Sequence, residues 1–154
     1  MENGAIFTGW SFGSSLAATG EVVFNTAMCG YQEALSDPSY TGQILVLTAP
    51  EIGNYGVNPE DVESRSIAVR GLVIRELARV PANYRAEGGL AAWLEEKGVP
   101  GIWGVDTRAI VRMLRDHGAR DRERELRREL ASPSLRSVAS VPLSVPLGLY
   151  PSPP

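Results

Sequence analysis

The chain has 154 residues, of which 44% are apolar, and a formal net charge of −3 at pH 7. That length fits one domain with a single hydrophobic core, and the charge gives no electrostatic reason to expect nucleic-acid binding. The single cysteine excludes an internal disulfide and a thiolate metal cluster within the chain, and one histidine is too few for a histidine-based metal site.

The sequence contains no run of about 18 consecutive apolar residues, which is the length that a membrane helix needs. Its N-terminus also lacks the basic segment and apolar stretch of a signal peptide. We therefore expect a cytoplasmic protein that makes no contact with a membrane.

The first half of the chain is predicted to form strands separated by turns. Residues 4–13 alternate apolar and polar side chains between glycines, which predicts a tight β-hairpin. Residues 21–26 and 43–48 predict two more strands, and the apolar run inside the second favours burial on both of its faces. Residues 68–75 form a further candidate strand.

The second half alternates helix and strand. Residues 88–98 have apolar side chains at helical spacing, and Gly98 stands where a left-handed cap is expected. Residues 102–105 predict a short strand, after which Asp106 is expected to cap a helix that ends at Gly118.

The order of these elements indicates a mixed α/β domain, with helices packed on one side of the sheets. The domain is expected to cover residues 1–119. Residues 120–154 have a different character, because a run of Arg and Glu is followed by a stretch with six of the eleven prolines. Proline at that density breaks helices and strands, so we expect this tail to be irregular.

Three polar loops carry candidate functional residues, and the residues alone leave two interpretations for each. Residues 37–40 (Asp-Pro-Ser-Tyr) form either a simple tight turn or a loop tip that offers the Ser39 hydroxyl to a ligand. Residues 52–56 are a glycine turn or a contact loop containing Asn54 and Tyr55. Arg108 is an exposed arginine at a helix start or is aimed at a carboxylate across an interface.

No catalytic set is visible in the sequence. Cys29 has no histidine near it in sequence, although a catalytic thiolate needs a base or a positive field. For His117, next to a probable helix end, a capping role is favoured over general-base catalysis. The phosphate loop, zinc-protease and serine-hydrolase motifs are also missing. We therefore expect no catalytic residue and no metal ligand, which leaves a binding or scaffolding domain.

Six segments, in matching order, make the chain resemble the N-terminal domain of the small, glutamine-hydrolysing subunit of carbamoyl phosphate synthetase. They are Gly-Glu-Val-Val-Phe-Asn-Thr (20–26), Gly-Tyr-Gln-Glu (30–33), Asp-Pro-Ser-Tyr (37–40), Ile-Gly-Asn-Tyr-Gly (52–56), Gly-Leu-Val-Ile-Arg (71–75) and Asp-Thr-Arg (106–108). The resemblance covers about residues 1–119, and it implies a three-layer β/β/α fold of the swivelling type.

The resemblance also implies a function. In this family a glutamine amidotransferase domain follows, and its cysteine and histidine release ammonia from L-glutamine. The large subunit then uses the ammonia, bicarbonate and ATP to make carbamoyl phosphate for arginine and pyrimidine biosynthesis. The resemblance thus implies part of a ligase whose ATP and metal belong to the large subunit, so no cofactor is expected in this chain.

Site residues follow from the resemblance as well. It implies that Ser39 contacts the glutamine held by the amidotransferase domain, in a positioning role, because a hydroxyl without a base is no nucleophile. Asn54, Tyr55 and Arg108 are expected in structural or interface roles, with the domain packing against the large subunit.

The chain departs from the family in two respects. The amidotransferase domain is absent, so we expect this polypeptide alone to be inactive. After Ala119 the family continues with a glycine and a strand, whereas this chain does not, and a frameshift near residue 120 is one hypothesis for the difference. A lost strand would leave a sheet edge unpaired. The alternative function is a stand-alone interaction or small-molecule-binding module of the same fold.

Overall fold

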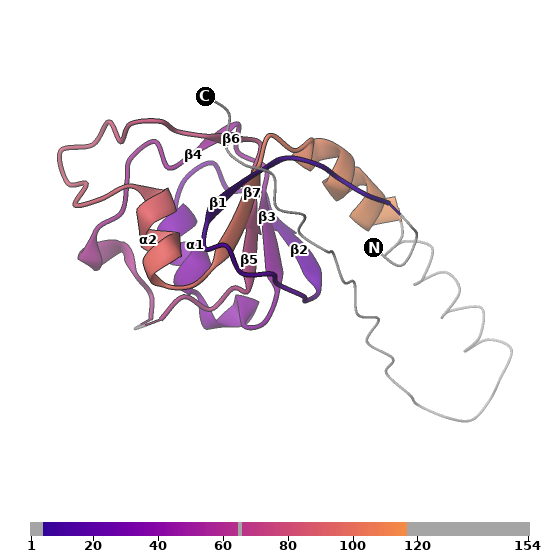
Figure 1. The fold of residues 1–154 in the computed structure, drawn as a ribbon, viewed down its shortest axis with the longest axis horizontal. Coiled ribbons are helices and arrows are strands. Elements are labelled where there is room, and N and C mark those ends of the chain that lie inside the picture. The colour runs from indigo at the N-terminus through magenta and orange to yellow at the C-terminus, as the bar shows by residue number, and fades with distance from the viewer. Residues whose placement is uncertain (1–4, 65, 117–154) are drawn as a thin grey trace, which may run out of the picture.

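A computed structural model describes residues 5–64 and 66–116 of the chain. The predictions made for His117, Gly118 and the tail over residues 120–154 lie outside this part. Within it, a central sheet carries helices on its faces, and a long loop extends to one side (Figure 1).

The central sheet has five strands in the order β1-β7-β5-β3-β2. Its strands are β1 (Trp10–Gly13), β2 (Val22–Asn25), β3 (Ile44–Leu47), β5 (Gly71–Val73) and β7 (Pro100–Trp103). Strands β2, β3, β5 and β7 run parallel to one another, and β1 is antiparallel to β7. The short strands β4 (Glu51–Ile52) and β6 (Glu76–Leu77) form a second, parallel sheet. The mixed α/β class is therefore confirmed.

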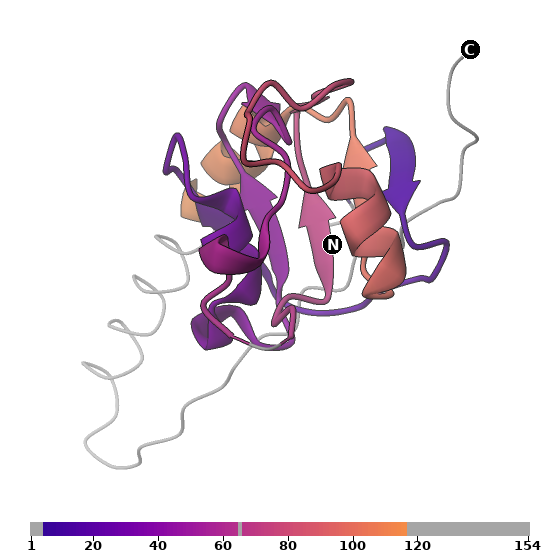
Figure 2. The same ribbon diagram turned by 90° about the vertical axis from the view of Figure 1, so that its left-hand side faces the viewer.

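Helices lie on both faces of the central sheet (Figures 1 and 2). They are α1 (Tyr31–Ser36), α2 (Leu90–Glu96) and a helix over residues 107–116, with two single turns, η1 (Pro38–Tyr40) and η2 (Pro59–Asp61). This differs from the expected arrangement on one side, and β3 shows why. Leu45 packs with α1 and α2, whereas Ile44 packs with Ile110 of the last helix.

The predicted hairpin over residues 4–13 is wrong. Of its described residues only 10–13 form a strand, and that strand pairs with β7, placing Trp10 opposite Trp103. The distant partner is favoured because β7 has a glycine where the Phe12 ring must lie. A Cβ on Gly101 would collide with that ring. The ring thus covers the edge of the first core cluster.

Most of the other predicted elements are present. Strands β2, β3 and β5 lie inside their predicted ranges, and β3 is buried along its whole length. Gly98 has the left-handed conformation expected after α2, with φ 71°. The Asp106 carboxylate accepts the Ala109 N–H at 3.0 Å and so caps the last helix. No helix in the described ranges is long and apolar enough to cross a membrane.

Candidate functional site

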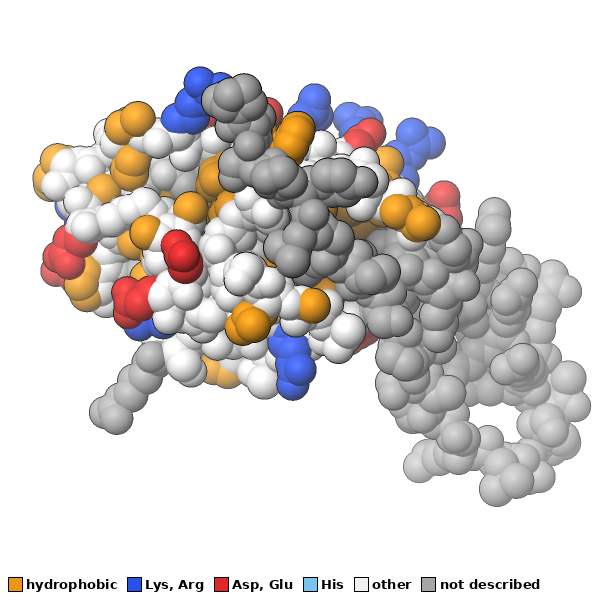
Figure 3. Space-filling model, viewed as in Figure 1, with side chains coloured by type: hydrophobic (Ala, Val, Ile, Leu, Met, Phe, Trp, Pro, Cys, Tyr) orange, Lys and Arg blue, Asp and Glu red, His pale blue; other side chains and the backbone are white. Residues whose placement is uncertain are grey.

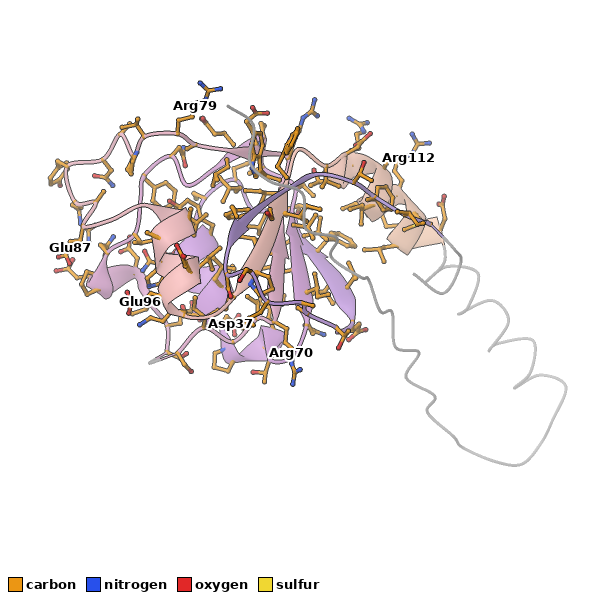
Figure 4. All side chains as sticks on the ribbon, in the orientation of Figure 1. Asp37, Arg70, Arg79, Glu87, Glu96 and Arg112 are labelled. Atoms are coloured by element: carbon orange, nitrogen blue, oxygen red, sulfur yellow. The ribbon has the colours of Figure 1, made fainter. Side chains whose placement is uncertain are left out.

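The four candidate residues lie toward two opposite ends of the central sheet. Ser39 is in η1, which comes just before β3, whereas Asn54 and Tyr55 come after it and Arg108 follows β7. Because β3, β5 and β7 are parallel, Ser39 lies at the amino end of these strands and the other three lie toward the carboxyl end. In Figure 4, Asp37 beside η1 and Arg112 in the last helix mark these two ends. The structure does not bring Ser39 together with the others.

The loop that carries Ser39 is held by its own hydrogen bonds. The Asp37 carboxylate accepts the Ser39 N–H at 2.8 Å, and the Thr41 hydroxyl donates to the Pro38 carbonyl at 2.6 Å. The hydrogen bond from the Ser39 amide, and secondarily that from its hydroxyl, lower the pKa of Asp37. Tyr40 packs against the core, and Ser39 itself is exposed. The loop can therefore present the serine side chain in a fixed position.

Tyr55 stabilises the beginning of α1. Its hydroxyl accepts the N–H groups of Gly30 at 2.7 Å and Tyr31 at 2.9 Å, and Gly30 offers no side-chain cap of its own. The rings of Tyr31 and Tyr55 stack with their centroids 4.1 Å apart. The Tyr31 hydroxyl donates to the Gly56 carbonyl at 2.5 Å, which is a further link between α1 and the 52–56 loop. Burial raises the pKa of both phenols.

Helix α1 and the buried polar contacts that hold it were not predicted from the sequence. The amide side chain of Gln32 donates to the Asn58 carbonyl at 2.6 Å and accepts the Asn58 N–H at 3.0 Å. One turn later, the Ser36 hydroxyl donates to the Gln32 carbonyl and accepts the Glu63 N–H. The signal in the sequence was the spacing of these two polar residues, which are four positions apart. The structure shows that both are buried. The spacing was missed because polar residues do not stand out in a search for apolar periodicity.

Asn54 and Arg108 are both exposed, and they differ in their polar contacts with the rest of the domain. The backbone carbonyl of Asn54 accepts the Ala82 N–H at 2.7 Å, which ties the 78–88 loop to the domain. Arg108 forms no ion pair with any carboxylate that the structure describes. Its guanidinium group therefore remains available to an outside partner.

A groove of about 540 Å³ lies between α1, η2 and α2, and none of the four candidates is among its lining residues. Gln32, Asn58 and Trp93 are among its lining residues, and the polar groups of the first two already bond to each other. Cys29 is exposed, and residues 5–64 and 66–116 contain no group of acidic, histidine or cysteine side chains suited to a metal. Among the described residues, none of these features pairs a nucleophile with a base.

Comparison with known proteins gives a family and close relatives. A family model described as "Carbamoyl-phosphate synthase small chain, CPSase domain" matches residues 1–122. The carbamoyl phosphate synthase small chain of Rhodopirellula baltica is 52% identical over 119 residues, which are 77% of this chain and 31% of that protein. The small chain of Akkermansia muciniphila is 56% identical over 119 residues, covering 77% and 32%.

The carbamoyl phosphate synthase pyrimidine-specific small chain of Bacillus subtilis is 55% identical over 119 residues, which are 77% of this chain and 33% of that protein. The chain thus spans about a third of the length of the curated relatives that it matches.

Proposed function

This chain belongs to the family of the carbamoyl-phosphate synthase small chain, CPSase domain, and on that premise we propose that it is the non-catalytic N-terminal domain of the glutamine-hydrolysing small subunit. The match over residues 1–122, with identities above 50% to named small chains, carries this proposal. It corresponds to the N-terminal region of such chains.

The proposed role is to support an amidotransferase domain that releases ammonia from L-glutamine. A large subunit would receive the ammonia and use ATP to make carbamoyl phosphate, in the cytoplasm, for arginine and pyrimidine biosynthesis. The pyrimidine-specific name of the Bacillus subtilis relative is consistent with the second pathway. The exposed Ser39 on a firmly held loop and the exposed Arg108 at the far end of the sheet suit a domain that lies between two neighbours.

The partner is tested by co-elution of this chain with the large subunit of the same source in size-exclusion chromatography. We expect a complex, with the complete small chain as the positive control. If neither this chain nor the complete small chain binds, the proposal is wrong. If only the complete small chain binds, a stand-alone interaction module becomes the better description.

The proposed glutamine contact is tested in the complete small chain of the same source, assembled with its large subunit. Ser39→Ala should raise KM for glutamine by about tenfold and leave kcat nearly unchanged, because the hydroxyl positions substrate without taking part in bond breaking. Ser66→Ala is the matched control, since Ser66 is another exposed serine on a different segment. An unchanged KM in Ser39→Ala would exclude this role.

A further inference from the structure

The helix over residues 107–116 has two different faces. On its apolar side, Ile110 packs with sheet residues such as Ile44, and Val111 is also buried. Its outer side carries Arg108, Arg112 and Arg115, all exposed and spaced four and three residues apart. Residues at this spacing lie on one side of a helix, so the three side chains form one row, which we call the arginine ridge.

The arginine ridge is costly for the isolated domain. Like charges three or four residues apart on a helix repel each other and destabilise the helix. None of the three arginines forms an ion pair with a carboxylate in the described ranges. The Arg115 guanidinium instead lies over the Phe24 ring, 5.2 Å from its centroid. That contact fixes one end of the ridge while leaving its N–H groups open to a partner.

Exposed apolar side chains flank the ridge. Trp10 is 38% exposed and lies beside Gly104, just before the helix, since a Cβ on Gly104 would be 3.2 Å from the Trp10 ring. Ile6 is 85% exposed, and its neighbour Phe7 packs on the same core cluster as Leu114. Figure 1 shows the N-terminal segment running alongside this helix.

Basic side chains are prominent on the edge that holds the arginine ridge, with some acidic side chains among them (Figure 3). Figure 3 shows Lys and Arg side chains along the upper edge, with Asp and Glu prominent on the left. Figure 4 places Glu87 and Glu96 on that left side, and Arg79 and Arg112 on the upper edge. Of the nearby carboxylates, Asp106 is occupied in capping the helix, and Asp116 stands at its far end without an ion pair to the ridge. The domain therefore offers a cationic surface at the carboxyl end of its parallel strands.

We infer that the arginine ridge, with Trp10 and Ile6 at its flank, is a docking surface for an acidic patch on another protein. Guanidinium groups bind carboxylates through two parallel hydrogen bonds, and arginine and tryptophan are enriched at the centres of protein interfaces. Exposed apolar anchors and the net charge of −3 favour a protein over nucleic acid. This inference rests on the proposed function, which makes the large subunit the owner of the acidic patch.

The test compares two charge reversals in binding to the large subunit. Arg108→Glu combined with Arg112→Glu should raise the dissociation constant by at least about tenfold. The dissociation constant of this variant should also change less than that of the wild type between about 50 and 300 mM salt. Arg70→Glu is the control and is matched to the single variant Arg112→Glu, because Arg70 is exposed, forms no ion pair in the described residues and lies at the amino end of the strands. Circular dichroism verifies that all variants stay folded, and Trp10→Ala tests the apolar flank independently.

The outcomes separate the two proposals. If the wild type and Arg70→Glu bind and the ridge variant does not, the docking surface is supported. If all three bind equally well, the docking surface is wrong and the proposed function stands. If the wild type fails to bind, the proposed function fails first. If the ridge variant loses affinity for duplex DNA but keeps full affinity for the large subunit, a phosphate surface replaces the protein one.

Discussion

The Tyr55 hydroxyl is the single polar group on which the start of α1 most depends. It accepts two backbone N–H groups where the helix has no side-chain cap. Gly30, in the left-handed conformation with φ 79°, turns both groups toward it. Two segments some 25 residues apart in sequence are thereby fixed to each other, which explains why a glycine turn over residues 52–56 carries a tyrosine.

Tyr55→Phe should therefore destabilise the domain by about 2 kcal/mol, because it removes one acceptor and leaves two backbone donors without a partner. The stacked ring is retained, so the loss reports the hydroxyl alone. The measurement is the denaturant midpoint of this chain. Tyr84→Phe, at a side chain that is 96% exposed, should not move the midpoint, and an equal shift in both variants would contradict the argument.

The same two tyrosines predict a loss of stability at alkaline pH. The pKa of Tyr31 and that of Tyr55 are both raised above the ordinary value of 10.0, with burial as the main cause. The folded state therefore holds these protons more tightly than the unfolded state. Their contribution is complete below about pH 10 and is lost as the pH rises through the folded pKa.

The measurement for this effect is the free energy of unfolding at about pH 8 and about pH 11. The wild type should lose stability between them, and Tyr31→Phe should show a smaller loss, even though it starts less stable at pH 8 without its hydrogen bond to Gly56. An equally steep loss in Tyr31→Phe would assign the pH dependence to other groups.

Pairing of β1 with β7 depends on a glycine. The Phe12 ring occupies the place where a side chain at Gly101 would begin, so Gly101→Ala must displace either the ring or the strand. We expect a destabilisation of about 2–3 kcal/mol, as overpacking of a core usually costs. Gly88→Ala is the control and should stay within about 0.5 kcal/mol, because its nearest outside atom would be an ordinary 3.7 Å from the added Cβ. Thermal unfolding of the two variants measures the difference.

Elements with local signals could be predicted from the sequence, and those that depend on distant partners could not. The apolar run of β3, the cap at Asp106 and the terminal glycine of α2 are local features, and all three are present. The glycines within residues 4–13 are also a local feature, and they predicted a hairpin. The true partner of β1 is β7, about 90 residues away in sequence.

The candidate site shows the same limit. Sequence motifs identified the loops of Ser39 and Tyr55, and the chemistry of residues 37–40 predicted the turn. The position of these loops at opposite ends of the sheet follows from strand order, which periodicity does not reveal. The buried contact between Gln32 of α1 and Asn58 joins segments 26 residues apart, so the local spacing of Gln32 and Ser36 could not reveal it.

The domain by itself should not release ammonia from glutamine. The proposed function places the catalytic cysteine and histidine in a separate amidotransferase domain, and a thiol such as that of the exposed Cys29 needs a base or a positive field to act as a nucleophile. We expect ammonia production equal to that of buffer in a coupled glutamate dehydrogenase assay, and no change in Cys29→Ser. Release of ammonia that is lost in Cys29→Ser would make this domain catalytic.

The separation between the Ser39 loop and the arginine ridge has a thermodynamic consequence. A stiff, fully buried strand stands between them, and they share no contact. Free-energy changes caused by substitutions at such remote positions normally add without coupling. If both proposed contacts exist, one neighbour can dissociate from its end while the other stays bound, and each affinity can evolve independently.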